Sequence, residues 1–486
     1  MQLNDQALLK QQAFIDGAWV SAPNGATFSV TDPANGAVIA QVADLDAQGA
    51  RTAIAAADKA LPGWQAKTAK ERAALLRRWY ELIVAAQEDL AVIMTTEQGK
   101  PLFESRGEVL YGASFIEWFA EEGKRVYGDI IPTHASDKRI LVTKAAVGVV
   151  AAITPWNFPN AMIARKAAPA LAAGCTIVIK PAKETPLSAL AMAELAQRAG
   201  IPAGVINVVV GSSSSVIGAE LTANPLVRKF TFTGSTAVGK ILLQQCAATV
   251  KKTSMELGGN APFIVFDDAD LDKAVEGALV SKYRNAGQTC VCANRILVQE
   301  GVYERFVGKL AARVAQFKIG HGLDPDTVIG PMINRGAVED VHAMVEDALA
   351  KGAKVLVGGA PASQGGCFYQ PTILTQVTPE MRVFREEIFG PIAPIFSFTD
   401  EAEAIRMAND TEYGLAAYFY ARDLGRVWRV MEGLDYGMVA INEGVLSTEV
   451  APFGGVKQSG SGREGSKYGI DDYIEMKYAL LGGVND

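Results

Sequence analysis

The stretch Val147-Gly-Val-Val-Ala-Ala-Ile153, which is followed after a helical segment by Thr176-Ile-Val-Ile-Lys180, decides the fold. Both runs are short, apolar and rich in β-branched residues, as is typical of strands that are buried on both faces. Short strands that alternate with helices predict βαβ units around a parallel sheet. The alternation continues to residue 257, with further strands expected at 205–210 and 228–232 and helices at 160–173, 186–199, 214–222 and 235–247.

The rest of the chain indicates more than one domain. A second α/β series begins with a strand at 262–266, contains helices at 271–286 and 302–317, and runs to about residue 441. Before the first series, the segment 70–97 has a helical pattern that Gly99-Lys-Pro101 closes. Because 486 residues are too many for one small core, we expect at least two packed units with room for a deep site between them.

The composition argues against several classes of function. The net charge is -7, with 49% hydrophobic and 20% charged residues, which is typical of a soluble globular protein and argues against a surface for nucleic acid or anionic membranes. The longest uncharged run, 145–164, contains two prolines, so a membrane helix is not expected. The five scattered cysteines and a polar N-terminus predict a reducing, cytoplasmic location without a secretory signal.

Two segments indicate the chemistry. Glu256 lies in Met255-Glu-Leu-Gly-Gly-Asn260, and Cys290 lies in Asn285-Ala-Gly-Gln-Thr-Cys290-Val-Cys-Ala-Asn-Arg295. A thiolate attacks a carbonyl well, and a carboxylate can activate water against the resulting thioester. The three histidines, at 134, 321 and 342, lie in bland polar contexts without a metal-ligand spacing. Their scarcity favours a carboxylate as the base, and no metal site is expected.

Two strand ends of the first series could hold a nucleotide. Gly234 and Ser235 follow a strand and open a helix, where free backbone N–H groups and the helix dipole suit a phosphate. The spacing is not that of the usual glycine-rich dinucleotide motif, so a plain strand-to-helix turn also explains it. Lys180 and Lys183 end another strand of the same sheet, either near an adenosine ribose or simply in solvent.

Six motifs resemble the aldehyde dehydrogenase superfamily in order, from about Phe14 to Tyr478. They are Thr154-Pro-Trp-Asn157-Phe-Pro, Phe232-Thr-Gly-Ser235-Thr, Met255-Glu256-Leu-Gly-Gly, Gly287-Gln-Thr-Cys290, Glu386-Glu387-Ile-Phe389-Gly-Pro391 and Pro452-Phe453-Gly-Gly. Within the superfamily, the segments 258–272, 288–295 and 461–469 are most similar to succinate-semialdehyde dehydrogenases. The resemblance implies a homo-oligomer, a dimer or tetramer, whose subunit has a Rossmann-type parallel-sheet dinucleotide-binding domain (1–123 and 145–256), an α/β catalytic domain (257–466) and a small β oligomerisation extension (124–144 and 467–486).

The resemblance also implies catalytic roles. Cys290 would attack the aldehyde, Glu256 would activate water against the thioester, and the Asn157 side chain would stabilise the oxyanion together with the backbone N–H of the nucleophile. Cys292 either closes a reversible disulfide with Cys290 or simply packs. Two further positions near the base form either a proton relay or a structural ion pair: Lys166 and Glu464.

The implied cofactor is NADP or NAD. The positions that match the cofactor contacts of the family are Pro155, Trp156, Lys180, Lys183, Gly234, Ser235, Leu257, Glu387 and Phe389. Family members that use NAD often carry Glu at the position of Lys183, where a carboxylate would repel the 2′-phosphate of NADP. A lysine attracts that phosphate, so NADP is the expected preference and NAD is the alternative.

The implied substrate is a small semialdehyde with a carboxylate at its far end. Arg165, Arg284 and Ser447 match substrate-anchoring positions of succinate-semialdehyde dehydrogenases, and two guanidinium groups suit a carboxylate. The expected reaction is oxidation of succinate semialdehyde to succinate, as in GABA degradation. Glutarate semialdehyde or a broader range of aldehydes is the alternative, and a cofactor-independent thiol esterase is less favoured.

Overall fold

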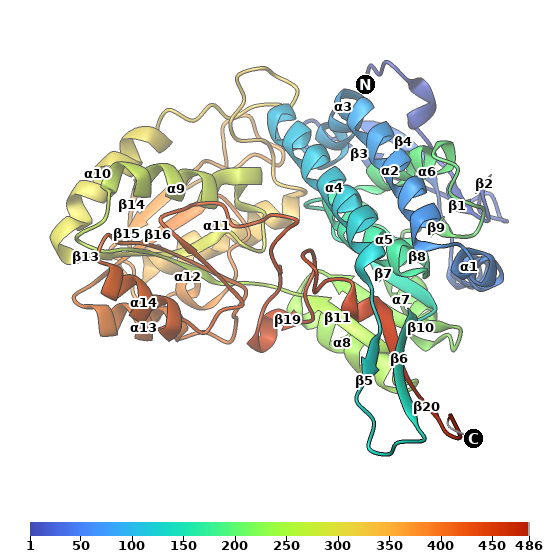
Figure 1. The fold of residues 1–486 in the computed structure, drawn as a ribbon. Helices are drawn as coiled ribbons and strands as arrows, with labels where there is room; N and C mark the ends of the chain where they lie inside the picture. Colours follow the sequence, from blue (N-terminus) through green and yellow to red (C-terminus); the bar gives the residue numbers. More distant parts are fainter. Residues whose placement is uncertain (485–486) are drawn as a thin grey trace.

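The computed structural model describes residues 1–484 and contains two large sheets, each surrounded by helices (Figure 1). The first sheet has the order β19-β11-β10-β7-β8-β9-β1-β2, and its five central strands are parallel. These five strands are β7 (Val149–Ile153), β8 (Thr176–Lys180), β9 (Ile206–Val208), β10 (Val227–Thr233) and β11 (Lys252–Glu256). Antiparallel strands lie at its edges: β19 (Gly460–Ser461), β1 (Ala13–Ile15) and β2 (Ala18–Val20).

The helices of the first series confirm the predicted alternation. They are α5 (Ala161–Ala173), α6 (Pro186–Arg198), α7 (Ser214–Ala223) and α8 (Thr236–Ala247). Every residue of β8 is buried, as a central parallel strand requires. The strand predicted at 205–210 is shorter than expected, because only Ile206–Val208 pair with the neighbouring strands.

The second sheet has the order β14-β15-β16-β13-β12-β17-β18, and all of its pairs except β14 with β15 are parallel. Its strands are β12 (Ala261–Val265), β13 (Ala293–Gln299), β14 (Lys354–Val357), β15 (Thr372–Thr375), β16 (Ile392–Phe398), β17 (Ala416–Tyr420) and β18 (Met438–Ile441). Its helices are α9 (Leu271–Tyr283), α10 (Tyr303–Val314), α11 (Arg335–Ala350), α12 (Arg382–Arg385), α13 (Glu401–Asn409) and α14 (Leu424–Gly433).

Two helix predictions need correction. The helix expected at 271–286 ends at Tyr283, because Asn285 and Ala286 are left-handed, with φ of 52° and 54°. The segment 70–97 forms two helices, α2 (Ala69–Ala85) and α3 (Gln87–Gln98), because Ala86 leaves helical geometry at ψ 14°. The second of them ends at Gly99 as predicted, since this glycine takes the left-handed φ of 99°.

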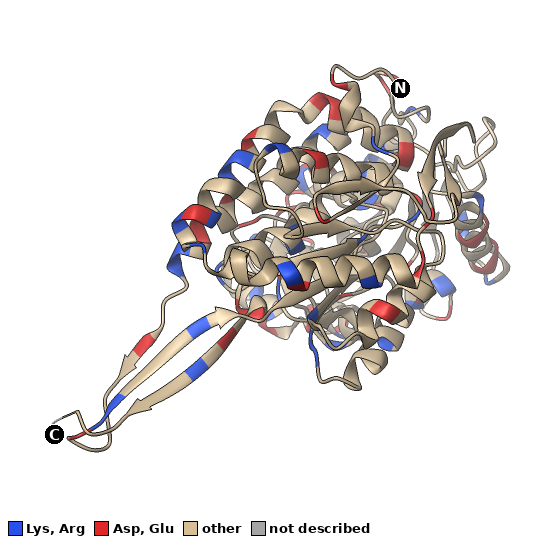
Figure 2. Cartoon of the chain, turned by 90° about the vertical axis from the view of Figure 1, so that its right-hand side faces the viewer, with Lys and Arg blue, Asp and Glu red and all other residues tan. Residues whose placement is uncertain are grey.

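The remaining elements cover the first sheet and form an arm. Helices α1 (Ala47–Gln65) and α4 (Leu102–Glu122) and the hairpin β3 (Thr27–Thr31) and β4 (Val38–Ala43) belong to the N-terminal part. The arm is a three-stranded sheet that projects from the body and carries charges of both signs (Figure 2). Its strands are β5 (Asp129–Ile131), β6 (Arg139–Ala146) and β20 (Ile474–Leu481).

Two large, separate apolar cores support the proposed division into domains, whose boundaries stay a prediction. One core runs from Leu3 to Leu257 and includes 470–474, and the other runs from Ala261 to Phe453. Of the predicted extension, residues 485 and 486 lie outside the described part. No helix within residues 1–484 is long and apolar enough to cross a membrane.

Gly460 is expected to be essential for joining β19 to β11. It has a φ of 135°, and a Cβ there would lie 1.9 Å from the backbone oxygen of Met255. We therefore expect Gly460→Ala to destabilise the protein by about 2 kcal/mol or more, measured by denaturant unfolding. Gly301→Ala is the control, because a Cβ at Gly301 meets open space. Equal stability of the two variants would contradict this account of the edge.

Candidate active site

The loops that carry Cys290 and Asn157 meet between the two sheets. Asn157 follows β7, and its side-chain Nδ2 donates to the carbonyl of Gln288 at 3.0 Å, just before the cysteine. Burial raises the pKa of the Cys290 thiol to about 12, although the guanidinium of Arg165 opposes this shift. A thiol with so high a pKa is neutral near pH 7, so the predicted attack by Cys290 would require a proton acceptor.

Glu256 supplies a buried carboxyl group at the end of β11. Its side chain is 4% exposed, and within residues 1–484 its Oε2 has no hydrogen-bond partner. A Cβ at Gly454 would lie 3.0 Å from the other oxygen, so the Pro452-Phe453-Gly-Gly motif passes directly against the carboxyl. Burial, followed by the charge of Glu464, raises the pKa of Glu256 well above its usual range, which suits a group that accepts a proton.

Arg165 and Lys166 hold Glu464 beside this base. Lys166 Nζ donates to Glu464 Oε1, and Arg165 Nε lies 2.8 Å from Glu464 Oε2. Burial raises the pKa of Glu464, but the two cations outweigh it and hold the pKa below the usual value. The Arg165 guanidinium also lies 3.8 Å from the ring centre of Phe453. Arg165, predicted to bind substrate, is thus engaged with Glu464 and Phe453.

The predicted cofactor residues near Glu256 lie around the start of α8. Ser235 caps α8 by accepting from Val238 N at 3.5 Å, and Gly234 N donates to the carbonyl of Glu256 at 3.0 Å. Leu257 is buried below α8, where a Cβ at Gly239 would meet its side chain at 2.4 Å. The turn predicted to bind a phosphate and the predicted catalytic base are therefore held together by a backbone hydrogen bond.

A second group of predicted cofactor residues lies on two loops, one after β7 and one after α12. Trp156, which follows the half-buried Pro155, packs edge-to-face with Phe389 at 5.6 Å between ring centres. Glu387 Oε1 accepts from Gly259 N at 2.9 Å, and burial raises the pKa of this carboxyl to about 7.

The two lysines differ in their surroundings. Lys180 ends β8 and is buried, and its Nζ donates to Ser214 Oγ at 2.8 Å and to the carbonyl of Pro181 at 3.0 Å. Burial lowers the pKa of Lys180 to about 8. Lys183 is exposed, three residues beyond the end of β8, so it is free to contact a group bound at the edge of the sheet.

These residues fit a nicotinamide dinucleotide. A Cβ at Gly258 would lie 2.7 Å from Glu387 Oε2. Glycine at this position therefore keeps the space between α8 and this carboxylate free of a side chain. The N-terminus of α8 offers backbone N–H groups to a phosphate, and Glu387 offers a carboxylate to ribose hydroxyls.

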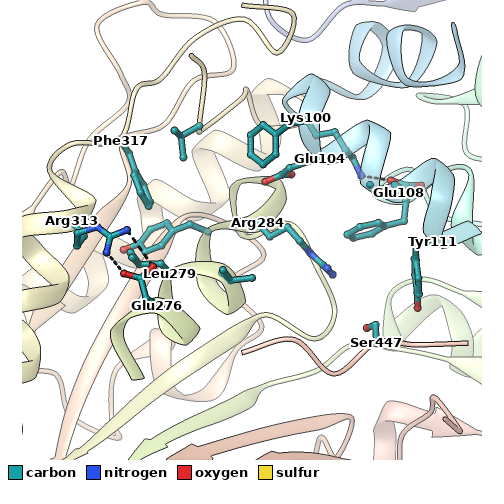
Figure 3. Close-up of a pocket in the computed structure, with 16 residues that line it drawn as sticks. Lys100, Glu104, Glu108, Tyr111, Glu276, Leu279, Arg284, Arg313, Phe317 and Ser447 are labelled. Carbon is teal, nitrogen blue, oxygen red and sulfur yellow. Dashed lines mark hydrogen bonds and ion pairs between the residues drawn. The ribbon is translucent and has the colours of Figure 1, made fainter. Parts of the chain in front are cut away.

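A cavity of about 530 Å³ contains the predicted substrate residues Arg284 and Ser447. The Arg284 guanidinium points toward Ser447 and Tyr111 (Figure 3) and lies 5.1 Å from the ring centre of Phe158. It forms no ion pair with any described residue. The other arginine of the cavity, Arg313, is instead ion-paired with Glu276.

Sequence reasoning missed the polar residues that α4 and the turn before it contribute. Lys100 is buried, pairs with Glu108 and donates to the carbonyl of Asn157 at 2.6 Å. Glu104 accepts from Asn285 N at 2.8 Å. Glu104 and Glu108 are four residues apart and share one face of α4, but this spacing does not show that the face turns inward. Within residues 1–484, no cluster of His, Cys, Asp and Glu could hold a metal ion.

Comparison with known proteins agrees with this geometry. A family model described as the aldehyde dehydrogenase family matches residues 19–479. The chain is 63% identical to a glutarate-semialdehyde dehydrogenase of Pseudomonas aeruginosa, covering 100% of both chains. It is also 63% identical to GabD of Escherichia coli K12, an NADP(+) succinate-semialdehyde dehydrogenase, covering 99% of this chain and 100% of that one.

Solved structures give the same assignment. A crystal structure of an NADP-dependent enzyme from E. coli has a TM-score of 0.98 and 62% sequence identity, covering 99% of this chain and 100% of that chain. The fold is therefore the α/β aldehyde dehydrogenase fold, built around the cysteine and glutamate segments described above. The chain belongs to the aldehyde dehydrogenase family and is an oxidoreductase.

Proposed function

We propose that the protein oxidises succinate semialdehyde to succinate, with NADP preferred over NAD and glutarate semialdehyde as the alternative substrate. The observation that carries this proposal is the unpaired Arg284 guanidinium, which faces a cavity together with Ser447 and Tyr111. A half-buried cation that forms no ion pair with a described residue favours an anionic ligand, and a carboxylate suits a guanidinium in geometry as well as charge. The relatives named for succinate and glutarate semialdehydes support the same class of substrate.

The first chemical step forms a bond between Cys290 Sγ and the aldehyde carbon. The thiol proton passes to Glu256, directly or through water, and the developing oxyanion accepts hydrogen bonds from Asn157 Nδ2 and the Cys290 backbone N–H. A bound nicotinamide cofactor supplies the acceptor for the hydride. The enzyme then holds a thioester on Cys290.

The second step hydrolyses that thioester. Glu256 first releases the thiol proton to solvent. It then takes a proton from a water molecule, which attacks the acyl carbon, and the Cys290 thiolate leaves and takes that proton back from Glu256. Arg165 and Lys166 hold Glu464 beside the base, where the three side chains either relay the proton or fix the loop. The resulting acid carries a carboxylate at both ends, one of them still at Arg284.

Further properties of the protein remain predictions. The exposed apolar side chains of the arm, including Ile130 and Met476, support a homo-oligomer, either a dimer or a tetramer. Cys292 is buried, and its thiol points to the carbonyl of Lys282 at 3.4 Å, which suits plain packing as well as a reversible disulfide with Cys290. A cytoplasmic location and a role in GABA degradation also stay predictions.

Replacing Arg284 tests the recognition of the carboxylate. We expect Arg284→Ala to lower kcat/KM about 30- to 100-fold for succinate semialdehyde, mainly through KM, because the anionic end loses its partner. With uncharged butanal the change should stay within about threefold. Arg313→Ala is the matched control, since Arg313 lines the same cavity but is paired with Glu276. Equal losses for the two aldehydes would refute the assignment.

Replacing Lys183 tests the choice of cofactor. We expect Lys183→Glu to lower kcat/KM for NADP at least about tenfold and to leave the value for NAD within about threefold, because a carboxylate repels the 2′-phosphate. Lys354→Glu, an exposed change on the second sheet, controls for the altered net charge. An unchanged ratio of kcat/KM for NADP to kcat/KM for NAD would show that Lys183 does not bind the 2′-phosphate.

The neutral state of Cys290 predicts a steep pH dependence of its alkylation. Since its pKa is raised to about 12, the thiolate fraction should increase about tenfold for each pH unit between 7 and 9. The rate of labelling of Cys290 by iodoacetamide in the cofactor-free protein, followed by peptide mass spectrometry, should rise in parallel. A rate that levels off below pH 8 would mean that the free protein already holds a thiolate.

A further inference from the structure

Asn285 lies at the centre of a buried hydrogen-bond network ahead of Cys290. Its Nδ2 donates to the carbonyl oxygens of Asn157 at 3.1 Å and Gln288 at 3.2 Å. Its Oδ1 accepts from Gln98 Nε2 at 2.9 Å, and its backbone N–H donates to Glu104 Oε2 at 2.8 Å. The residue is 1% exposed, and its own carbonyl accepts from Gln288 Nε2 at 3.1 Å. Every polar group of Asn285 therefore has a partner.

The backbone at this position explains the choice of residue. Asn285, Ala286 and Gly287 are all left-handed, with φ of 52°, 54° and 76°. Asparagine tolerates this conformation better than most residues. The three-residue turn sets the direction of the chain as it approaches Cys290. A Cβ at Gly287 would lie 2.2 Å from the backbone oxygen of Gly390, so the turn is also held by close packing.

The same network fixes the orientation of the oxyanion donor. The side-chain amide of Asn157 has two N–H bonds, and one of them donates to the carbonyl of Gln288 at 3.0 Å. The second N–H remains available to a substrate oxygen. The Asn157 carbonyl accepts from Asn285 and, at 2.6 Å, from Lys100 Nζ, so its backbone is held from two sides.

We propose that Asn285 is a positioning residue that joins the Asn157 loop to the nucleophile segment and keeps one N–H of Asn157 aimed at the oxyanion. Its amide contacts the two carbonyls, of Asn157 and Gln288, that define where the donor and the thiol lie. Asn285 acts through Asn157, and the inference therefore rests on the oxyanion role given to Asn157 in the proposed function.

A double-mutant cycle tests this inference, with kcat measured at saturating succinate semialdehyde and NADP. Asn285→Gly keeps the left-handed backbone and removes the amide, and we expect it to lower kcat about 10- to 100-fold with KM within about threefold. Asn157→Ala should lower kcat about 100-fold or more. Because Asn285 acts through Asn157, the double variant should be no slower than Asn157→Ala within about threefold.

The outcomes distinguish the positioning role of Asn285 from the oxyanion role of Asn157. Losses that multiply in the double variant, or an unchanged kcat in Asn285→Gly, would overturn the role of Asn285 alone. A normal kcat in Asn157→Ala would overturn this role together with the proposed oxyanion donor. If Asn285→Gly does not fold, Gln98→Met, which removes the donor to Asn285 Oδ1, enters the same cycle and should show the same non-additivity with a loss of about fivefold.

Asn207→Ala is the matched structural control. Asn207 is also fully buried, donates to the carbonyl of Gly204 at 2.7 Å, and accepts from Asp16 N at 3.0 Å, but it lies on β9, where it contacts none of the proposed catalytic residues. It should lower the Tm as Asn285→Gly does and leave kcat within about twofold. A loss of kcat in Asn207→Ala equal to that in Asn285→Gly would show that lost stability alone explains the effect and would overturn the proposal.

Discussion

The burial of Glu464 between Arg165 and Lys166 is the constraint on which the rest of the site depends. The two partners of the Lys166–Glu464 hydrogen bond are 298 residues apart in sequence, and both side chains are buried. Leaving one partner of a buried ion pair without the other typically destabilises a protein by about 3–5 kcal/mol. The folded state therefore favours the packing of the C-terminal segment, which carries Glu464, against α5. Its return pairs β19 with β11, places Gly454 against Glu256 and carries β20 to β6.

This return also sets the electrostatics of catalysis. Burial raises the pKa of both Cys290 and Glu256, and Arg165 opposes the shift in each case. In the proposed mechanism, transfer of the thiol proton to the carboxylate form of Glu256 moves a negative charge toward the reacting carbon without creating a new one, and the raised pKa of Glu256 favours that transfer. The site can therefore generate a nucleophile in a region with little water, where separate charges would be costly.

Much of this arrangement could be predicted from the sequence, because it depends on local patterns. The alternation of apolar strands and helices gave the parallel sheets, and the motifs around Asn157, Glu256 and Cys290 indicated residues that the fold does bring to one region. The break between α2 and α3 at Ala86 was missed, since no proline or glycine marks it. The end of α9 was missed because two non-glycine residues adopt left-handed geometry.

The contributions of α4 and of the turn before it could not be predicted, because they depend on tertiary contacts. Lys100, Glu104 and Glu108 have the polar character of an exposed helix face, yet they turn inward to the carbonyl of Asn157 and the backbone of Asn285. Arg165 and Arg284 were expected to act together on the substrate. In the structure Arg165 pairs with Glu464, whereas Arg284 is left facing the cavity.

The central claim is that the site recognises an aldehyde by the carboxylate at its far end. The most direct test is the initial rate of NADP reduction with succinate semialdehyde, glutarate semialdehyde and butanal at matched enzyme concentration. We expect a kcat/KM at least about 100-fold higher for succinate semialdehyde than for butanal, and a difference of about 1–3 kcal/mol between the two semialdehydes, which differ by one methylene. An efficiency for butanal equal to that for both acids would contradict it.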